Sequence, residues 1–200
     1  MGAAKRGVTT VIAETERLRL REWGEGDADR FYQVMNTPAV MQWLGGVQDR
    51  SGWNGAAKRI ISYQRDYGFT FWLAERLADG ELLGFCGLKR ANAPGAEAIF
   101  GDVEIGWRLR EEAWGQGYAK EAAIESLDLA FGRFDAPHVV AVTALGNLAS
   151  QGLMKRLGMV RREDLDFIDQ RFAPDSATNP QIVYRIDAAQ WPAARAAALA

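Results

Sequence analysis

Two glycines between a strand-like run and a helix-like run form the first candidate binding site in this chain. Gly115 and Gly117 follow the alternating apolar run 103–109 and precede the apolar-periodic run 118–131. Glycine has no Cβ to block the close approach of a ligand, and the free N–H groups at a helix N-terminus attract anions. The arrangement therefore indicates a site for a phosphate or pyrophosphate group, although a tight turn would use the same two glycines.

The known phosphate-binding motifs match this stretch only in part. A dinucleotide fingerprint requires a third glycine where Lys120 stands, and a P-loop requires the sequence Gly-Lys-Ser/Thr, which is absent after these glycines. The stretch thus favours a phosphate-bearing ligand without assigning it to either of these nucleotide classes.

Four further residues have side chains that could take part in chemistry. Glu104 is a carboxylate inside an apolar strand-like run, which strand propensity alone does not explain, although it could face solvent. Asn147 and Ser150 stand between a strand and a short helix, where both could simply satisfy backbone groups at the helix start. Cys86 lies in the apolar run 82–88 with no assignable base nearby, so we expect it to be a small core residue.

Strands and helices must bring these residues together, and the apolar periodicity predicts them. Strands are expected over residues 17–23, 70–76, 82–88, 103–109, 138–144, 160–167 and 181–186. Asp79-Gly80 is typical of a hairpin turn, so three consecutive strands are expected to form an antiparallel meander.

Helices are expected between these strands and at the end of the chain. Asp27 is expected to cap the first helix, and Thr37-Pro38 to begin a second that Gly45-Gly46 stops. A loop is expected over 49–55, and further helices over 56–67, 118–131, 150–157 and after Asp187. The helix at 118–131 has a face of small side chains, which would let it lie close to a sheet.

Composition limits the classes of protein to which the chain can belong. Two hundred residues with 48% hydrophobic content suit one domain, expected over 14–200, after a loosely held tail over 1–13. A net charge of −2 argues against nucleic acid as the main ligand, and no apolar run approaches the ~20 residues of a membrane span. The chain start lacks the apolar run of a secretory signal. One cysteine and one histidine argue against a disulfide and a zinc site, so we expect a cytoplasmic protein without a metal.

Taken in order, these segments resemble the GNAT superfamily of acyl-CoA-dependent N-acetyltransferases. The resemblance rests on a strand, the stretch Trp114-Gly115-Gln116-Gly117-Tyr118-Ala119, a helix, a strand, Asn147-Leu148-Ala149-Ser150 and Leu157-Gly158-Met159. Thr15 to Leu20 and Glu104 to Trp107 are similar to the branch that contains the ribosomal-protein N-terminal acetyltransferases. The resemblance covers nearly the whole chain, residues 14–186. It departs from the superfamily pattern at Glu112, where glutamine or arginine is usual.

The resemblance implies an α/β fold with a mixed, mostly antiparallel central sheet flanked by helices. The strands at 103–109 and 138–144 would be parallel and would splay apart to admit the cofactor. The implied function is transfer of acetyl from acetyl-CoA to a primary amine, by direct attack in a ternary complex.

The resemblance also implies roles for the candidate residues. Glu104 would be the general base, Ser150 would protonate the departing thiolate, and Asn147 would hydrogen-bond the pantetheine arm. Trp43, beside the two glycines at 45 and 46, is a candidate for the acceptor site. Backbone N–H groups of Trp107, Arg108 and Leu109 would stabilise the oxyanion if the strand bulges there, and the pyrophosphate would be held by Ala113, Trp114, Gly115, Gln116, Gly117, Tyr118 and Ala119.

The acceptor is the least determined part of this prediction. A peptide or protein N-terminal α-amine is the leading candidate, by resemblance to the branch. A small amine, such as an amino acid, polyamine or antibiotic, is the rival, and a catalytically silent acyl-CoA-binding module is a third possibility. The walls of the acceptor groove are expected from residues 36–55 and 166–180. A monomer and a homodimer both remain open, and no partner nucleic acid or membrane is expected.

Overall fold

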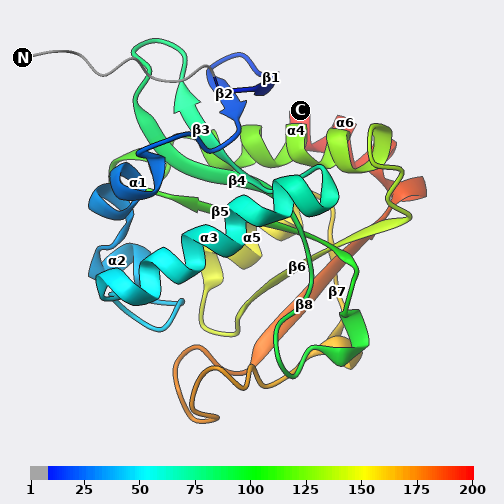
Figure 1. Ribbon diagram of the computed structural model, residues 1–200. Helices are drawn as coiled ribbons and strands as arrows, with labels where there is room; N and C mark the ends of the chain where they lie inside the picture. The colour runs from blue at the N-terminus through cyan, green and yellow to red at the C-terminus, as the bar shows by residue number, and fades with distance from the viewer. Residues whose placement is uncertain (1–8) are drawn as a thin grey trace, which may run out of the picture.

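The computed structural model describes residues 9–200, and its centre is a sheet of eight strands in the order β1-β2-β3-β4-β5-β6-β8-β7 (Figure 1). The strands are β1 (Val11–Glu14), β2 (Leu18–Arg21), β3 (Phe71–Arg76), β4 (Leu82–Arg90), β5 (Val103–Leu109), β6 (His138–Ala144), β7 (Val160–Arg161) and β8 (Gln181–Asp187). The helices are α1 (Asp27–Met35), α2 (Pro38–Met41), α3 (Arg50–Tyr67), α4 (Tyr118–Gly132), α5 (Leu148–Arg156) and α6 (Trp191–Leu199). The expected mixed α/β architecture is confirmed, including the antiparallel meander of β3, β4 and β5.

Strands β5 and β6 are the one parallel pair among the paired strands of residues 9–200. They pair only where Val103 faces Val139 and Glu104 faces Val140. Beyond these residues, β5 continues to Leu109 and β6 to Ala144, but the two strands no longer pair with each other. The predicted splay of these two strands is therefore confirmed, and it opens a gap in the middle of the sheet.

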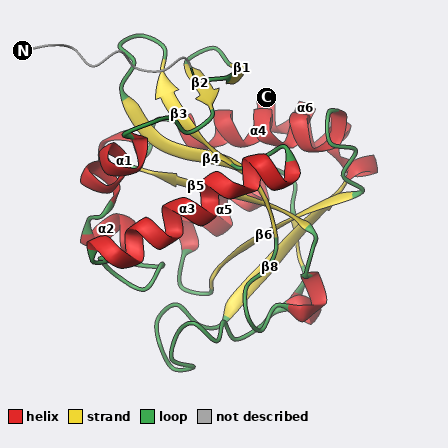
Figure 2. Ribbon diagram, in the orientation of Figure 1, coloured by secondary structure: helices red, strands yellow, loops and turns green. Residues whose placement is uncertain are grey.

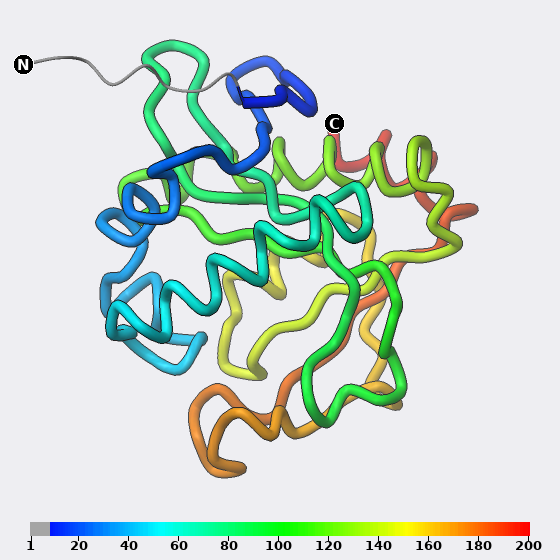
Figure 3. Tube along the Cα trace, viewed as in Figure 1, coloured from blue at the N-terminus to red at the C-terminus, as the bar shows by residue number. Residues whose placement is uncertain are grey.

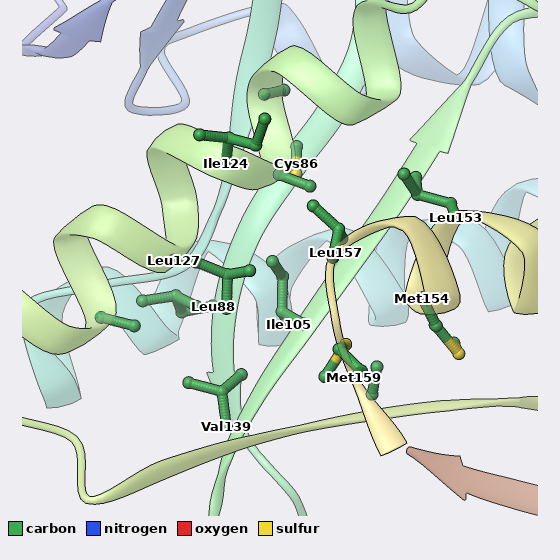
Figure 4. Close-up of a cluster of buried hydrophobic side chains, with 14 of the residues drawn as sticks. Cys86, Leu88, Ile105, Ile124, Leu127, Val139, Leu153, Met154, Leu157 and Met159 are labelled. Atoms are coloured by element: carbon green, nitrogen blue, oxygen red, sulfur yellow. The ribbon is translucent and has the colours of Figure 1, made fainter. Parts of the chain in front are cut away.

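Helices cover both faces of the sheet (Figure 2). On one face, α4, α5 and α6 pack against the strands in a large apolar core. Figure 4 shows part of this core, where Leu127 of α4 lies beside Leu88 and Ile105 of the sheet. The small side chains of α4 that face the sheet are fully buried, as expected for a closely packed helix: Ala122, Ala123, Ser126 and Ala130.

The other face of the sheet is covered by α1, α2 and α3, whose apolar side chains form a second core with β3 and β4. Because side chains alternate along a strand, β5 contributes to both faces. Ile105 and Leu109 point into the core beneath α4. Gly106 and Arg108 point to the opposite face, toward Phe71 and Phe85 respectively.

The predicted loop over residues 49–55 is wrong, because α3 begins at Arg50. The Asp49 carboxylate accepts a hydrogen bond from the Gly52 N–H at 2.7 Å and caps the helix. Trp53 is buried, with its ring 5.5 Å from that of Phe31. Burying a large aromatic side chain and forming a cap together outweigh the helix cost of the glycines at 52 and 55, which is roughly 1 kcal/mol each. Two large apolar side chains of α3, Ile61 and Tyr67, are nevertheless exposed.

The predicted strand over 160–167 is also too long. Only Val160 and Arg161 form β7, and a 3-10 turn follows at Glu163–Leu165. Asp166 accepts a hydrogen bond from the guanidinium of Arg161 and another from the backbone N–H of Val183 at 3.1 Å. This carboxylate takes the place that a backbone carbonyl would have in a longer strand.

Two expectations near the N-terminus need smaller corrections. Strand β1 begins at Val11, so ordered structure starts before residue 14, while residues 1–8 of the expected tail lie outside the described part of the chain. Gly26, not Asp27, is the N-cap of α1, because the Asp27 carboxylate is held by the guanidinium of Arg21.

The loop over 166–180 lies at the end of the molecule opposite β1 and β2 (Figure 3). Between residues 9 and 200, no helix is both long and apolar enough to cross a membrane.

Candidate active site

A cleft of about 750 Å³ opens where β5 and β6 separate. Its walls come from α2 and the segment after it, from β5, from the turn before α4, and from the end of β6 with the start of α5. The cleft collects almost all of the residues singled out from the sequence: Trp43, Glu104, Trp107, Arg108, Leu109, Ala113, Trp114, Gly115, Gly117, Tyr118, Ala119, Asn147 and Ser150. Gln116 is the exception, because its amide instead donates to the carbonyl of Glu112.

The glycine turn forms one wall of the cleft. Gly115 and Gly117 have φ values of 72° and 82°, in the left-handed region that side chains with a Cβ rarely adopt. Gly117 is the N-cap of α4, a helix of 15 residues, and no side chain caps its first N–H groups. Free N–H groups at the start of a long helix form an anion site. The turn therefore has the backbone conformation and the uncapped helix start that an anion site needs, and the anion site itself stays a prediction.

Residues from the far N-terminal part of the chain brace this turn. Arg17 donates to the carbonyl of Gln116 at 3.0 Å, and its guanidinium lies 4.6 Å from the centre of the Tyr118 ring. Its Nε and its backbone N–H both donate to the carboxylate of Glu121 in the first turn of α4. The hydroxyl of Thr15 donates to the same carboxylate at 2.5 Å. The turn is therefore held between β2 and α4 by hydrogen bonds to one carboxylate.

The hydrogen bonds from Thr15 and Arg17 change the pKa of Glu121. Burial acts to raise the pKa of this carboxyl, but the hydrogen bonds from Thr15 and Arg17 outweigh it, so the pKa lies below its usual value. Thr15 and Arg17 belong to the N-terminal stretch that supports the resemblance, but sequence reasoning assigned them no role. Their contact with Glu121 supplies one.

The backbone of β5 presents free N–H groups to the cleft. The Arg110 N–H donates to the Leu83 carbonyl and the Ala91 N–H to the Asp102 carbonyl, so even-numbered residues of this strand bond to β4. Backbone groups alternate in direction along a strand, so the N–H groups of Trp107 and Leu109 point to the other side, where β6 has moved away. The pairing with β4 is regular throughout, so the bulge expected here is not present. Arg108 reaches the cleft through its side chain and not through its N–H.

Glu104 lies at the closed end of the gap, where it forms the last parallel pair with Val140 of β6. Lys89, directly opposite on β4, places its Nζ 2.5 Å from Oε2 of Glu104, and these side chains are only 15% and 14% exposed. The pKa of Arg171 is raised, chiefly by its hydrogen bond to Asp169, and the negative charge of Glu104 contributes. Glu104 is therefore a nearly enclosed carboxylate in a positive environment, with Oε2 occupied by Lys89.

Asn147 and Ser150 lie on the β6 side of the cleft. The Asn147 side-chain oxygen accepts a hydrogen bond from the Ser150 N–H at 3.2 Å, so Asn147 is the N-cap of α5, as its simpler interpretation predicted. The amide NH₂ of Asn147 and the hydroxyl of Ser150 have no recorded partner among residues 9–200, and both residues line the cleft. Both side chains can therefore still donate to a ligand.

Trp43 forms the opposite wall and touches the β6–α5 turn. A Cβ at Gly146 would lie 2.7 Å from the Trp43 ring, so the ring packs closely against this glycine. Nearby, a Cβ at Gly45 would lie 2.6 Å from the ring of Phe172. The two segments expected to form the acceptor groove, 36–55 and 166–180, therefore meet at this point, although only the first contributes residues to the cleft itself.

The side chain of Arg108 is the feature of the cleft that sequence reasoning missed. Its Nε is completely buried without a hydrogen-bond partner. The only recorded contacts of the guanidinium with residues 9–200 are the Phe85 ring, with its centre at 5.2 Å, and the Met41 sulfur at 3.7 Å. Burial lowers the pKa of Arg108 to about 10. No pattern in the sequence indicates that Arg108 lacks a hydrogen-bond partner, so only the structure could show it.

Cys86 is a core residue, as expected. It is fully buried, and its sulfur lies 3.5 Å from the hydroxyl of Ser126. Burial raises the pKa of this thiol to about 12, although the contacts with Ser126 and the Gly87 N–H act in the other direction. A thiol that remains protonated at neutral pH is a poor nucleophile. Among residues 9–200, no three His, Cys, Asp or Glu side chains gather as a metal site.

A family model described as "Acetyltransferase (GNAT) domain" matches residues 17–160. The chain belongs to this family. It is an N-acetyltransferase, and the family's co-substrate is acetyl-CoA. The uncharacterised protein YkkB of Bacillus subtilis is 32% identical over 146 residues, covering 72% of this chain and 83% of that protein. FsC-acetyl coenzyme A-N(2)-transacetylase of Aspergillus fumigatus is 29% identical over 126 residues, covering 62% of this chain and 52% of that protein.

Solved structures share the fold of this GNAT acetyltransferase. An acetyltransferase from Agrobacterium tumefaciens superposes with a TM-score of 0.71 at 25% identity, over 93% of this chain and 98% of that one. RimL, a ribosomal L7/L12 alpha-N-protein acetyltransferase, superposes with a TM-score of 0.69 at 17% identity, over 93% and 99%. At this identity the likeness to RimL shows the fold alone, so the narrower branch suggested by the sequence stays a prediction.

Proposed function

We propose that this GNAT acetyltransferase transfers acetyl from acetyl-CoA to the α-amine of a peptide or protein N-terminus. The observation that carries the proposal is the gap between β5 and β6, which joins the glycine turn on one face of the sheet to a groove beneath α2 on the other. A ligand that passes through the gap can keep its phosphates at α4 while its thioester reaches the groove. We also propose that the enzyme is cytoplasmic and that its reaction needs no metal ion.

The cofactor would be held mainly by backbone groups. N–H groups from Gly115 to Ala119 would bind the pyrophosphate at the start of α4, where the helix dipole favours negative charge. The pantetheine arm would continue along β5, and the free amide of Asn147 would donate a hydrogen bond to it. Lys120 and Arg156 also line the cleft and would add positive charge near the phosphates.

The reaction would be a direct attack by the amine nitrogen on the thioester carbonyl carbon. The carbonyl oxygen becomes negative as the C–N bond forms, and the N–H groups of Trp107 and Leu109 point to where it would lie. The C–S bond then breaks, and the thiolate leaves with the electron pair. The attacking nitrogen still has one proton to lose, and the Ser150 hydroxyl, free of a protein partner, would hydrogen-bond the thiolate and relay this proton to it.

Glu104 would help the amine to lose its proton. Because Lys89 occupies Oε2, the other carboxylate oxygen is the one available to a substrate or to an intervening water. A carboxylate is a modest base, which suits an acceptor that is already partly deprotonated. The reference pKa of an α-amine is about 7.7–8.0, against about 10.4 for a lysine side chain, so the α-amine needs far less help at neutral pH.

A small amine is the second candidate acceptor. One relative of this chain is named as a transacetylase acting at an N(2) position, at 29% identity.

A panel of acceptors assayed for release of free CoA tests the proposal. The panel contains peptides with a free α-amine, the same peptides blocked at the N-terminus but carrying a lysine, and a polyamine. We expect the free α-amines to give the highest kcat/KM. Faster turnover of the polyamine would favour the small-amine alternative. Binding of CoA without thiol release from any amine would instead show a silent acyl-CoA-binding module.

A further inference from the structure

The guanidinium of Arg108 is a buried positive charge on the acceptor side of the cleft. We propose that Arg108 binds a carboxylate of the acceptor, so that the substrate is an amine that also carries an anionic group. This inference rests on the proposed function, because it adds a second recognised group to the same acceptor. It assigns a specificity role to a side chain whose pattern in the sequence predicts only a strand.

The positive charge of Arg108 has no ion-pair partner among residues 9–200. Nε of Arg108 is completely buried and makes no hydrogen bond. Nη1 meets only the sulfur of Met41 at 3.7 Å, and a thioether is a weak acceptor. The ring of Phe85 offers a face to the cation but no hydrogen-bond acceptor. The guanidinium is thus partly buried, with one fully enclosed N–H donor and no oxygen acceptor within reach, which is unusual for an arginine in such a position.

The carboxylates on neighbouring elements are occupied elsewhere. Glu111, just after β5, accepts a hydrogen bond from the Thr37 hydroxyl at 2.7 Å. Glu104, on the same face of β5, is paired with Lys89. Glu81, at the start of the neighbouring strand, is paired with arginines at positions 76 and 110. No ion pair to Arg108 is recorded among the described residues, so its natural counter-ion is a ligand.

Of the ligands that the cleft would hold, the acceptor is the one that can bring an anionic group to Arg108. The phosphates of CoA would lie at the start of α4, on the opposite face of the sheet from the Arg108 side chain. The acetyl group carries no charge. The acceptor is the remaining occupant of the cleft on the face covered by α2 and α3.

The spacing along β5 places the carboxylate close to the reacting amine. Glu104, Gly106 and Arg108 lie on one face of the strand, so neighbours in this row are about 7 Å apart. Gly106 puts no side chain between the two charged ones, and the Phe71 ring packs directly against it, since a Cβ there would lie 2.8 Å from the ring; both residues line the cleft. An amine near Gly106 would have Glu104 on one side and Arg108 on the other. An α-amino acid fits this distance with its α-carboxylate, and a peptide fits it with an acidic side chain near its N-terminus.

Arginine is suited to this task. Its planar fork makes two parallel hydrogen bonds to a carboxylate, and a site built this way rejects an uncharged analogue strongly because the buried donors are then left unpaired. The same residue therefore explains both binding and discrimination.

The test compares matched acceptors that differ only in the carboxylate. One pair is a free amino acid and its amide, and a second is a short peptide with glutamate at its second position and the same peptide with glutamine there. The wild-type protein is expected to prefer the acid of one pair by about 10- to 100-fold in kcat/KM. The pair that shows the preference tells whether the carboxylate belongs to a small amine or to a peptide.

The variants are Arg108→Gln and Arg108→Lys, with Arg59→Gln as the matched control, because Arg59 is an exposed arginine of α3 outside the cleft. Arg108→Gln is expected to raise KM for the acid until the acid and the amide have similar kcat/KM, so that the preference for the acid is lost. Arg108→Lys should restore part of the preference. An equal preference in wild type and Arg108→Gln, or no preference in the wild type, would overturn the proposal.

A binding measurement separates this proposal from the proposed function. Calorimetry of the CoA-bound protein with an N-acetyl amino acid, and with its amide, requires no turnover. Tighter binding of the acid that is lost in Arg108→Gln would support the carboxylate site even if no amine is acetylated. Equal binding of acid and amide would reject the site even if acetylation is observed.

Discussion

Replacing Arg108 with methionine is expected to make the free protein more stable, although it would damage the acceptor site. Burial lowers the pKa of this guanidinium well below its usual value, to about 10. Since each tenfold change in proton affinity corresponds to about 1.4 kcal/mol, the charged form is disfavoured in the folded protein by roughly 3 kcal/mol. Methionine has a similar length and no charge, so the variant removes this penalty while it fills most of the same space.

Part of that gain is lost with the favourable contacts of the guanidinium. The stacking of Arg108 on Phe85 contributes about 1 kcal/mol. The expected net increase in the free energy of unfolding is therefore about 2 kcal/mol, which corresponds to a rise in Tm of about 4–8 °C for a chain of this size. Thermal and urea unfolding near neutral pH, without ligands, would measure it.

The pH dependence of unfolding provides a second test of whether Arg108 destabilises the folded protein. Because the folded pKa lies below the unfolded one, Arg108 destabilises the protein fully below about pH 10, and the penalty fades only as the pH rises from there toward the higher pKa of the unfolded chain. The advantage of Arg108→Met should thus be constant from about pH 6 to about pH 9. Arg59→Met, at an exposed position of α3, should change stability by less than about 0.5 kcal/mol. A lower Tm for Arg108→Met than for wild type would mean that the guanidinium is already satisfied, and would refute the reasoning.

Four other variants test the rest of the site. Gly117→Val should raise the Kd for CoA by about 10- to 100-fold in calorimetry, because a β-branched residue resists φ of 82° and moves the N–H donors, whereas Gly132→Ala in the same helix should not. Ser150→Ala should lower kcat more than it raises the Kd for CoA, and intact turnover would leave the serine as a helix-start residue. Glu104→Gln should slow a peptide acceptor most below about pH 8, so equal slowing at both ends of a pH–rate profile would exclude the base role. Because the folded pKa of Glu121 is lowered, its stabilising effect is present above its unfolded pKa of about 4.3 and lost in more acidic solution, so Glu121→Gln should lower Tm at pH 7 but much less near pH 3.

The features that the sequence could predict are those carried by local pattern. The apolar alternation predicted β5 and β6 as strands, and the glycines at 115 and 117 predicted the turn, because each depends on a few consecutive residues. The parallel pairing and splay of these two strands came from the resemblance to the family and not from local pattern. Helix α3 was predicted too short because glycines at 52 and 55 signal a loop locally. Only the burial of Trp53 against α1 overrides that signal.

Pairings between distant residues could not be predicted in this way. Thr15 and Glu121 are separated by 106 positions, and nothing in either neighbourhood indicates the other. The pairing of Lys89 with Glu104 depends on the register of β4 and β5, which the loop between them leaves open. The absence of a hydrogen-bond partner for Arg108 is still harder to predict from the sequence, because it depends on where all the neighbouring acceptors lie in the fold.

The register of β4 against β5 is what allows one strand to serve two substrates. Odd-numbered residues of β5 aim their N–H groups into the gap, and Gly106 and Arg108 aim their side chains at the acceptor face. A slip by one residue would exchange these directions along the whole strand. Gly84 helps to exclude such a slip, since a Cβ there would lie 2.0 Å from the Arg108 carbonyl oxygen and no other residue allows this approach. Residues that never touch a substrate, such as Gly84, therefore determine which side of β5 meets the cofactor and which side meets the amine.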